Sequence, residues 1–270
     1  MTHSIIILFF AGVMLALWYA ARWFLRLTPP LFTEGLGPIR SYRTLDNAWI
    51  VGCVVGITLL PALLSGEQEK EPTVPQLVSD PLIYAALIVA VIAFLLVRTH
   101  LGGIRFFGFR RAPIPRAVRL GFQYGLAAIP PVLFLSYCMT SLATRLGLEQ
   151  PMQAIFGHLK DPAIPLWAKA TLICSTVILA PVYEEMLFRG LLFPALLGNR
   201  PKGWSAALLC GTAFALVHMQ ATTFLPLLLF SILLCAGYLA TGSLITPIVM
   251  HIIFNGMNLL IWLEFQTTGT

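Results

Sequence analysis

The chain has 270 residues, of which 58% are hydrophobic and only 10% are charged, and its mean hydropathy is +0.86. Soluble domains carry about 25% charged residues, so this composition excludes a soluble globular protein and predicts a polytopic membrane protein. A net charge of +6 looks basic, but the positive residues cluster in connections between apolar runs. We therefore read them as topology signals and expect no nucleic-acid partner.

Eight apolar runs are candidates to cross a bilayer core of about 30 Å, which takes about 20 helical residues. In chain order they cover residues 5–25, 49–64, 82–97, 120–142, 166–197, 204–219, 222–239 and 244–263. The second and sixth runs are short and fit tilted or partly buried helices. We predict an all-α bundle of about eight transmembrane spans. Residues 1–150 form an N-terminal region without an assigned role, and residues 151–270 form the functional core.

The distribution of lysine and arginine predicts the orientation of the spans. Twelve of the 17 basic residues lie in the first, third and fifth connections, and four lie in the others. The positive-inside rule then places both termini outside and the odd-numbered connections in the cytoplasm. We expect an integral protein of the plasma membrane in preference to the endoplasmic reticulum, with its site open toward the cytoplasm.

Three ionisable residues lie within the fifth apolar run: Glu184, Glu185 and Arg189. A charged side chain at the centre of a bilayer costs roughly 2.5–3.5 kcal/mol on insertion scales, so such residues need partners and usually a function. Adjacent residues point about 100° apart on a helix, so the two glutamates cannot share one role. Glu185 and Arg189 stand at i and i+4 with the acid first, which favours a supporting ion pair. Glu184 is then the free carboxylate.

Three further polar residues follow in the next apolar runs. His218 ends the run that begins at Phe214, and His251 and Asn255 are four residues apart, on one face of the last helix. A carboxylate can take a proton from water, an imidazole can orient that water, and other donors can stabilise an oxyanion. The set is therefore complete for hydrolysis, although each residue alone fits a structural hydrogen bond between helices.

The order and spacing of these residues resemble a known family. Glu184-Glu185-x-x-x-Arg189, Phe214-x-x-x-His218 and His251-x-x-x-Asn255 are similar to the motifs of the CPBP intramembrane proteases. That family includes the CAAX prenyl endoproteases and the bacterial Abi and bacteriocin-immunity proteins. The flanking Ala180-Pro181 agrees with this pattern, and the resemblance covers about residues 166–263.

The resemblance implies a role for each matching residue. Glu184 matches the catalytic glutamate, which activates water together with the histidine that matches His218. His251 and Asn255 match the pair that holds the oxyanion. The implied activity is a metal-independent intramembrane glutamic endopeptidase. Its substrate would be a peptide bond in a membrane-associated protein, either of the prenylated CAAX type or without a prenyl group.

Three alternatives stay open from the sequence. The two histidines and two glutamates could form a zinc site with three protein ligands and an open position. The polar cluster could serve folding or partner binding in a non-proteolytic scaffold or immunity factor. It could also relay protons in a transporter, although the two halves of the chain show no inverted repeat.

Overall fold

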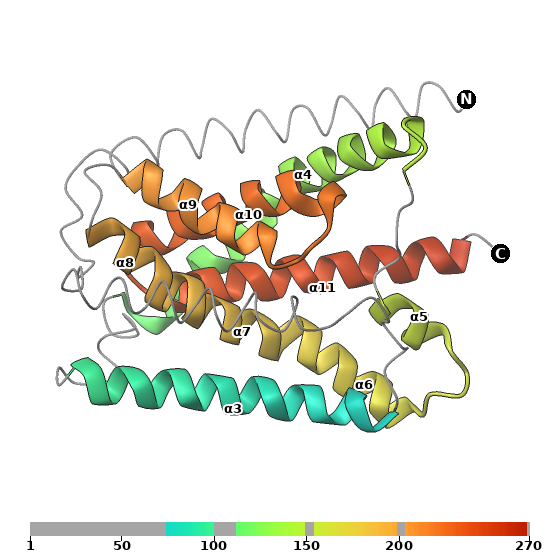
Figure 1. The fold of residues 1–270 in the computed structure, drawn as a ribbon, viewed down its shortest axis with the longest axis horizontal. Helices are drawn as coiled ribbons and strands as arrows, with labels where there is room; N and C mark the ends of the chain where they lie inside the picture. The colour runs from blue at the N-terminus through green and yellow to red at the C-terminus, as the bar shows by residue number, and fades with distance from the viewer. Residues whose placement is uncertain (1–73, 100–111, 149–153, 199–202, 269–270) are drawn as a thin grey trace.

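The computed structural model describes residues 74–99, 112–148, 154–198 and 203–268, and every element in these ranges is helical (Figure 1). The elements are α3 (Val74–Thr99), α4 (Ile114–Arg145), α5 (Ala154–Lys160), α6 (Leu166–Cys174), η2 (Ser175–Leu179), α7 (Ala180–Glu185), η3 (Met186–Leu192), α8 (Phe193–Gly198), α9 (Gly203–Leu216), α10 (Ala221–Thr241) and α11 (Ile245–Thr268). The segments η2 and η3 are π-helical. The all-α prediction is confirmed for the described part of the chain, where no strand occurs.

Four helices in these ranges are long and apolar enough to cross a membrane, as expected of an integral membrane protein. They are Ile114–Arg145, Leu166–Leu197, Ala221–Thr241 and Ile245–Glu264. The second of them has the bounds predicted for the run that holds the glutamates. The predicted run 82–97 lies within α3, and the short run 204–219 forms the short α9. The runs 5–25 and 49–64 lie outside the described residues, so the count of about eight spans is not confirmed.

Helix α11 lies in the middle of the bundle (Figure 1). It contacts α4 and α10 on one side and α7 and η2 on the other, while α3 packs on the outer side of α6 and α7. The five elements from α6 to α8 follow one another along a single continuous rod. The glutamate-bearing rod is therefore covered by α3 on one side and by α11 on the other.

The outer faces of these helices are apolar. Within the most apolar windows of the four candidate spans, only 22–50% of residues are buried inside the bundle. Exposed side chains such as Leu126 on α4 and Leu225 on α10 cover the surface. In a bilayer these side chains contact lipid tails, and the backbone polar groups are satisfied within each helix.

Helices α4 and α11 approach each other closely because Gly121 and Gly125 are four residues apart on the facing side of α4. A Cβ atom added at Gly121 would lie 2.8 Å from the Thr246 carbonyl oxygen and from the Val249 Cβ atom. The Thr246 hydroxyl also donates to the Ala117 carbonyl of α4 at 3.2 Å. Small residues at this spacing let two membrane helices pack backbone against backbone. This contact fixes the helix that carries His251 and Asn255.

We expect Gly121→Ala to lower the free energy of unfolding by about 1–3 kcal/mol, because the added methyl meets backbone atoms that cannot move aside. The matched control is Gly157→Ala on α5, where an added Cβ atom meets nothing within 4 Å. That variant should be neutral or slightly stabilising, since alanine has the higher helix propensity. Denaturant titration of the two purified variants measures the difference. Equal stabilities would contradict the close packing.

A tight turn joins α10 to α11 and sets the start of the last helix. Gly242 ends α10 with φ 63°, a left-handed conformation that favours glycine, and its N–H donates to the Tyr238 carbonyl at 2.7 Å. Across the turn, the hydroxyls of Thr241 and Thr246 are hydrogen-bonded at 2.9 Å. The turn returns the chain beside α10 and brings His251 level with the rod.

Candidate active site

The rod that carries the glutamates departs from α-helical geometry on both sides of them. The π-helical segment η2 precedes α7, and the π-helical segment η3 follows it. Glu184 and Glu185 are the last two residues of α7 and thus lie between the two. Single π turns inside α-helices occur often at functional sites.

Each π-helical segment ends next to a proline. The N–H of Ala180 donates to the carbonyl of Ser175, five residues back, and Pro181 follows. The N–H of Phe193 likewise donates to the carbonyl of Phe188, and Pro194 follows. Proline has no N–H to donate, so the helix cannot continue its backbone hydrogen bonds unchanged past these two positions.

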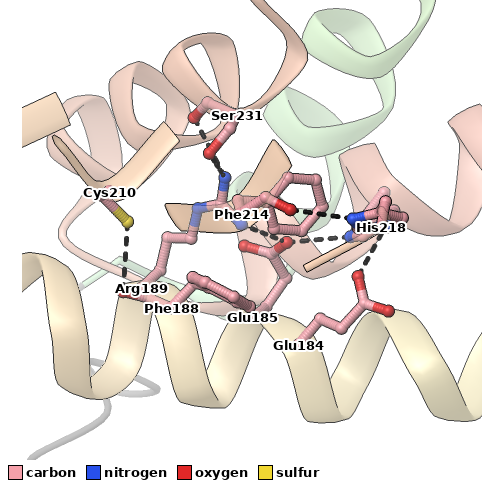
Figure 2. Close-up of polar contacts among 9 residues, drawn as sticks. Glu184, Glu185, Phe188, Arg189, Cys210, Phe214, His218 and Ser231 are labelled. Atoms are coloured by element: carbon pink, nitrogen blue, oxygen red, sulfur yellow. Dashed lines mark hydrogen bonds and ion pairs between the residues drawn. The ribbon is translucent and has the colours of Figure 1, made fainter. Parts of the chain in front are cut away.

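Glu185 and Arg189 form the predicted ion pair in full burial. Both side chains have 0% exposure, and Arg189 Nη1 donates to Glu185 Oε1 at 2.9 Å (Figure 2). The other end of the guanidinium donates from Nη2 to Ser231 on α10, at 2.6 Å to the hydroxyl and 3.0 Å to the carbonyl. The Phe214 ring lies 5.0 Å from the guanidinium carbon, a distance that suits a cation–π contact. Arg189 therefore ties the rod to α9 and α10.

His251 connects the two glutamates. Its Nδ1 lies 2.9 Å from Glu185 Oε1, and its Nε2 lies 3.8 Å from Glu184 Oε2. The rings of Phe214 and Phe230 pack edge-on against the imidazole, with centroids 5.8 and 5.3 Å away. A carboxylate only accepts hydrogen bonds, so Nδ1 carries a proton. In the neutral ring Nε2 carries no proton and can only accept a hydrogen bond. In the doubly protonated ring Nε2 carries a proton and can donate one.

Glu184 differs from its neighbour in what its carboxylate contacts. Its side chain is 22% exposed, yet the Oε2 atom is buried and has no hydrogen-bond partner among the described residues. Its one ionic contact among the described residues is with Nε2 of His251, at 3.8 Å, which is too long for a direct hydrogen bond. A buried polar atom without a partner costs stability. The Oε2 atom of Glu185 is likewise buried without a partner, but its Oε1 atom binds Arg189 and His251, so Glu184 is the carboxylate that no described residue holds at hydrogen-bond distance.

His218 lies just beyond the end of α9, on an exposed turn. Its Nδ1 is 2.8 Å from the Phe214 carbonyl, which can only accept, so the neutral ring presents Nε2 as an acceptor. The next residue, Met219, has φ 53°, an uncommon left-handed conformation for a side chain of this size. Within the described part of the chain no hydrogen bond or ion pair joins His218 to Glu184. The two histidines share a neighbour, because the Phe214 ring also lies 4.9 Å from that of His218.

Asn255 contacts the rod one helical turn after His251. Its Nδ2 donates to the Thr176 carbonyl, within η2, at 3.0 Å. Because the carboxamide nitrogen has two hydrogens, one remains for a further acceptor. His251 and Asn255 thus both face the rod, at Glu185 and at Thr176, as their i, i+4 spacing predicted.

Several residues of this network were not predicted from the sequence. Ser231 is a lone buried serine in the apolar α10, and its burial could have suggested a partner. The Phe214 side chain was noted only as part of a motif, although its ring touches Arg189 and both histidines. Thr176 contacts Asn255 through its backbone carbonyl, so the residue type at position 176 does not predict the contact. Among the described residues, no group of three or more His, Cys, Asp or Glu side chains could hold a metal ion.

Comparison with protein families gives a match in the region of this network. The family model described as "Type II CAAX prenyl endopeptidase Rce1-like" matches residues 166–257. The matched range begins with the rod and includes all seven of the motif residues from Glu184 to Asn255. Comparisons with the curated proteins and with the solved structures find no match.

Proposed function

We propose that this protein is an intramembrane glutamic endopeptidase, because residues 166–257 match the Rce1-like family model and the polar network lies within that range. Its substrate would be a membrane-associated protein whose peptide bond reaches the site within the bilayer. The observation that carries the proposal is the contrast between the glutamates. Glu185 is fully buried and its Oε1 atom pairs with Arg189 and His251 at 2.9 Å, whereas Glu184 is 22% exposed and comes no closer than 3.8 Å to its one ionic partner among the described residues, His251.

In the proposed reaction Glu184 takes a proton from a water molecule, and the oxygen of that water attacks the carbonyl carbon of the scissile bond. His218 presents an accepting Nε2 that suits orientation of the same water. The resulting oxyanion is stabilised by the remaining N–H of Asn255 and by His251 in its doubly protonated form. Glu184 then gives its proton to the leaving nitrogen, and the C–N bond breaks to give a carboxylic acid and an amine.

Glu185 has a supporting role in this proposal. It accepts the Nδ1–H of His251 at 2.9 Å, which fixes the ring orientation and directs Nε2 toward Glu184. Arg189 also donates to Glu185, and Ser231 holds the other end of the Arg189 guanidinium. We further propose that residues 151–270 form the protease core and that its cavity opens toward the cytoplasm.

The test is cleavage by the full-length protein in liposomes. The reporter is a quenched fluorescent peptide that ends in a prenylated CAAX sequence, assayed beside the same peptide without the lipid. We expect cleavage of the prenylated peptide at the same rate before and after exhaustive chelation, because a carboxylate activates the water. Stoichiometric zinc whose removal abolishes cleavage would contradict the glutamic mechanism. Comparison of the two peptides shows whether the prenyl group is required.

A further inference from the structure

We propose that Pro181 is a positioning residue for Asn255: its missing N–H leaves the Thr176 carbonyl free to bind the carboxamide of Asn255 and so to fix its orientation. The consequence for catalysis rests on the proposed function, in which Asn255 binds the oxyanion. The contact itself does not depend on that function and can be tested separately.

The chain lacks the N–H that would continue the hydrogen-bond pattern at the end of η2. The N–H of Ala180 donates to the carbonyl of Ser175, five residues back. If the same pattern continued by one residue, the N–H at position 181 would donate to the carbonyl of Thr176. Position 181 is a proline and has no N–H. The Thr176 carbonyl is therefore left without its π-helical partner.

A side chain from another helix takes the place of this donor. Asn255 Nδ2 lies 3.0 Å from the Thr176 oxygen and comes from α11, 79 residues further along the chain. A backbone carbonyl that has no hydrogen-bond donor inside a membrane bundle lowers the stability of the fold. The hydrogen bond from Asn255 removes this cost. One turn earlier on the same helix, His251 is held by Glu185 at 2.9 Å. Two contacts with the rod thus orient both residues of the proposed oxyanion site.

The second proline of the rod supplies the matched control. Pro194 likewise follows a residue whose N–H donates five residues back, in this case Phe193 to Phe188. Near this π turn the side-chain donor is the thiol of Cys210, 3.7 Å from the Phe188 oxygen. That contact is at the second π turn, on the far side of the glutamates from Thr176. A proline substitution here changes the same kind of turn without touching Asn255.

The experiment compares Pro181→Ala with Pro194→Ala in the full-length protein. In Pro181→Ala a backbone N–H becomes available to the Thr176 carbonyl and competes with Asn255. We expect kcat to fall about five- to tenfold with KM unchanged, the loss of about one oriented hydrogen bond in the transition state. The fall is partial because a carbonyl oxygen can accept two hydrogen bonds. Pro194→Ala should retain the wild-type kcat.

A double-mutant cycle separates positioning from a general structural effect. In an Asn255→Ala background, Pro181→Ala should cause no further fall in kcat, because there is no carboxamide left to orient. An equal fall in the presence and absence of Asn255 would overturn the inference, as would an equal fall in Pro194→Ala.

A second readout does not require protease activity. In protein labelled with ¹⁵N-asparagine, the side-chain amide signal of Asn255 is assigned by its loss in Asn255→Ala. We expect this signal to shift in Pro181→Ala and to stay in place in Pro194→Ala. An unmoved signal in both variants overturns the inference. If the wild-type protein cleaves neither peptide, the proposed function is wrong. The side-chain amide signal of Asn255 would still show whether Pro181 controls the orientation of Asn255.

Discussion

Glu184→Gln should lower kcat for peptide cleavage by about a thousandfold, because glutamine has nearly the same shape as glutamate but cannot take a proton from water. Folding should be unaffected. The Oε2 atom of Glu184 has no hydrogen-bond partner in the described part of the chain, so the substitution breaks no hydrogen bond of this atom and weakens only the 3.8 Å contact with His251. We expect a free energy of unfolding equal to or slightly above that of the wild type, as is common when a residue kept for activity is replaced.

The control for this variant is Glu264→Gln, at the exposed end of α11, which should keep full activity. Initial rates in liposomes and denaturant titration of the same preparations give both quantities. Full activity of Glu184→Gln would refute the glutamic mechanism. A large loss of stability would instead favour the scaffold alternative, in which the polar cluster exists for folding.

Arg189→Met should lower the free energy of unfolding by about 3–5 kcal/mol, which is the cost of leaving a buried charge without its partner. The side chain of Arg189 is fully buried, and its loss leaves the Glu185 carboxylate with His251 as its only described partner. It also removes two hydrogen bonds to Ser231 and the contact with the Phe214 ring. Methionine has enough apolar volume that a large cavity does not explain the effect.

Two further variants make this prediction specific. Arg145→Met, on an exposed arginine at the end of α4, should change the stability by less than about 0.5 kcal/mol. Combining Arg189→Met with Glu185→Gln should recover at least half of the loss, because the amide is uncharged and still accepts from His251. If the free energy of unfolding of Arg189→Met lies within about 1 kcal/mol of the wild-type value, the Glu185–Arg189 pair is not what holds these helices together.

The sequence predicted the features that depend on local spacing and composition. The length of the rod follows from its apolar run, and the Glu185–Arg189 pair follows from the i, i+4 rule. The angular separation of adjacent residues correctly set Glu184 apart from Glu185. These predictions needed no knowledge of neighbouring helices.

Contacts between distant helices were beyond such rules. Ser231 reaches Arg189 across 42 residues and His251 reaches Glu185 across 66, and no spacing rule relates such positions. The sequence assigned Glu185 one partner, whereas the structure gives it two. Similarly, the sequence related Glu184 to His218 through a shared water, and did not predict the 3.8 Å contact of Glu184 with His251.

The π-helical segments were missed because hydropathy does not distinguish an i+4 from an i+5 hydrogen bond. The available signal was the placement of Pro181 and Pro194 inside a long apolar run. A proline in a membrane helix indicates that some carbonyl must find another donor. Here that requirement leads from Pro181 to Asn255.

The two π turns also have a consequence for the angular register of the rod. A π turn holds one residue more than an α turn, so each acts as a single-residue insertion that rotates the next helical stretch by about 100°. The rod is then three α-helical stretches, and the middle one presents the glutamates at an angle set independently of α6 and α8. Loss of one residue from either turn would leave the length and hydropathy of the span almost unchanged. It would nevertheless rotate the glutamates by about 100° relative to the α-helical stretch on the other side of that turn.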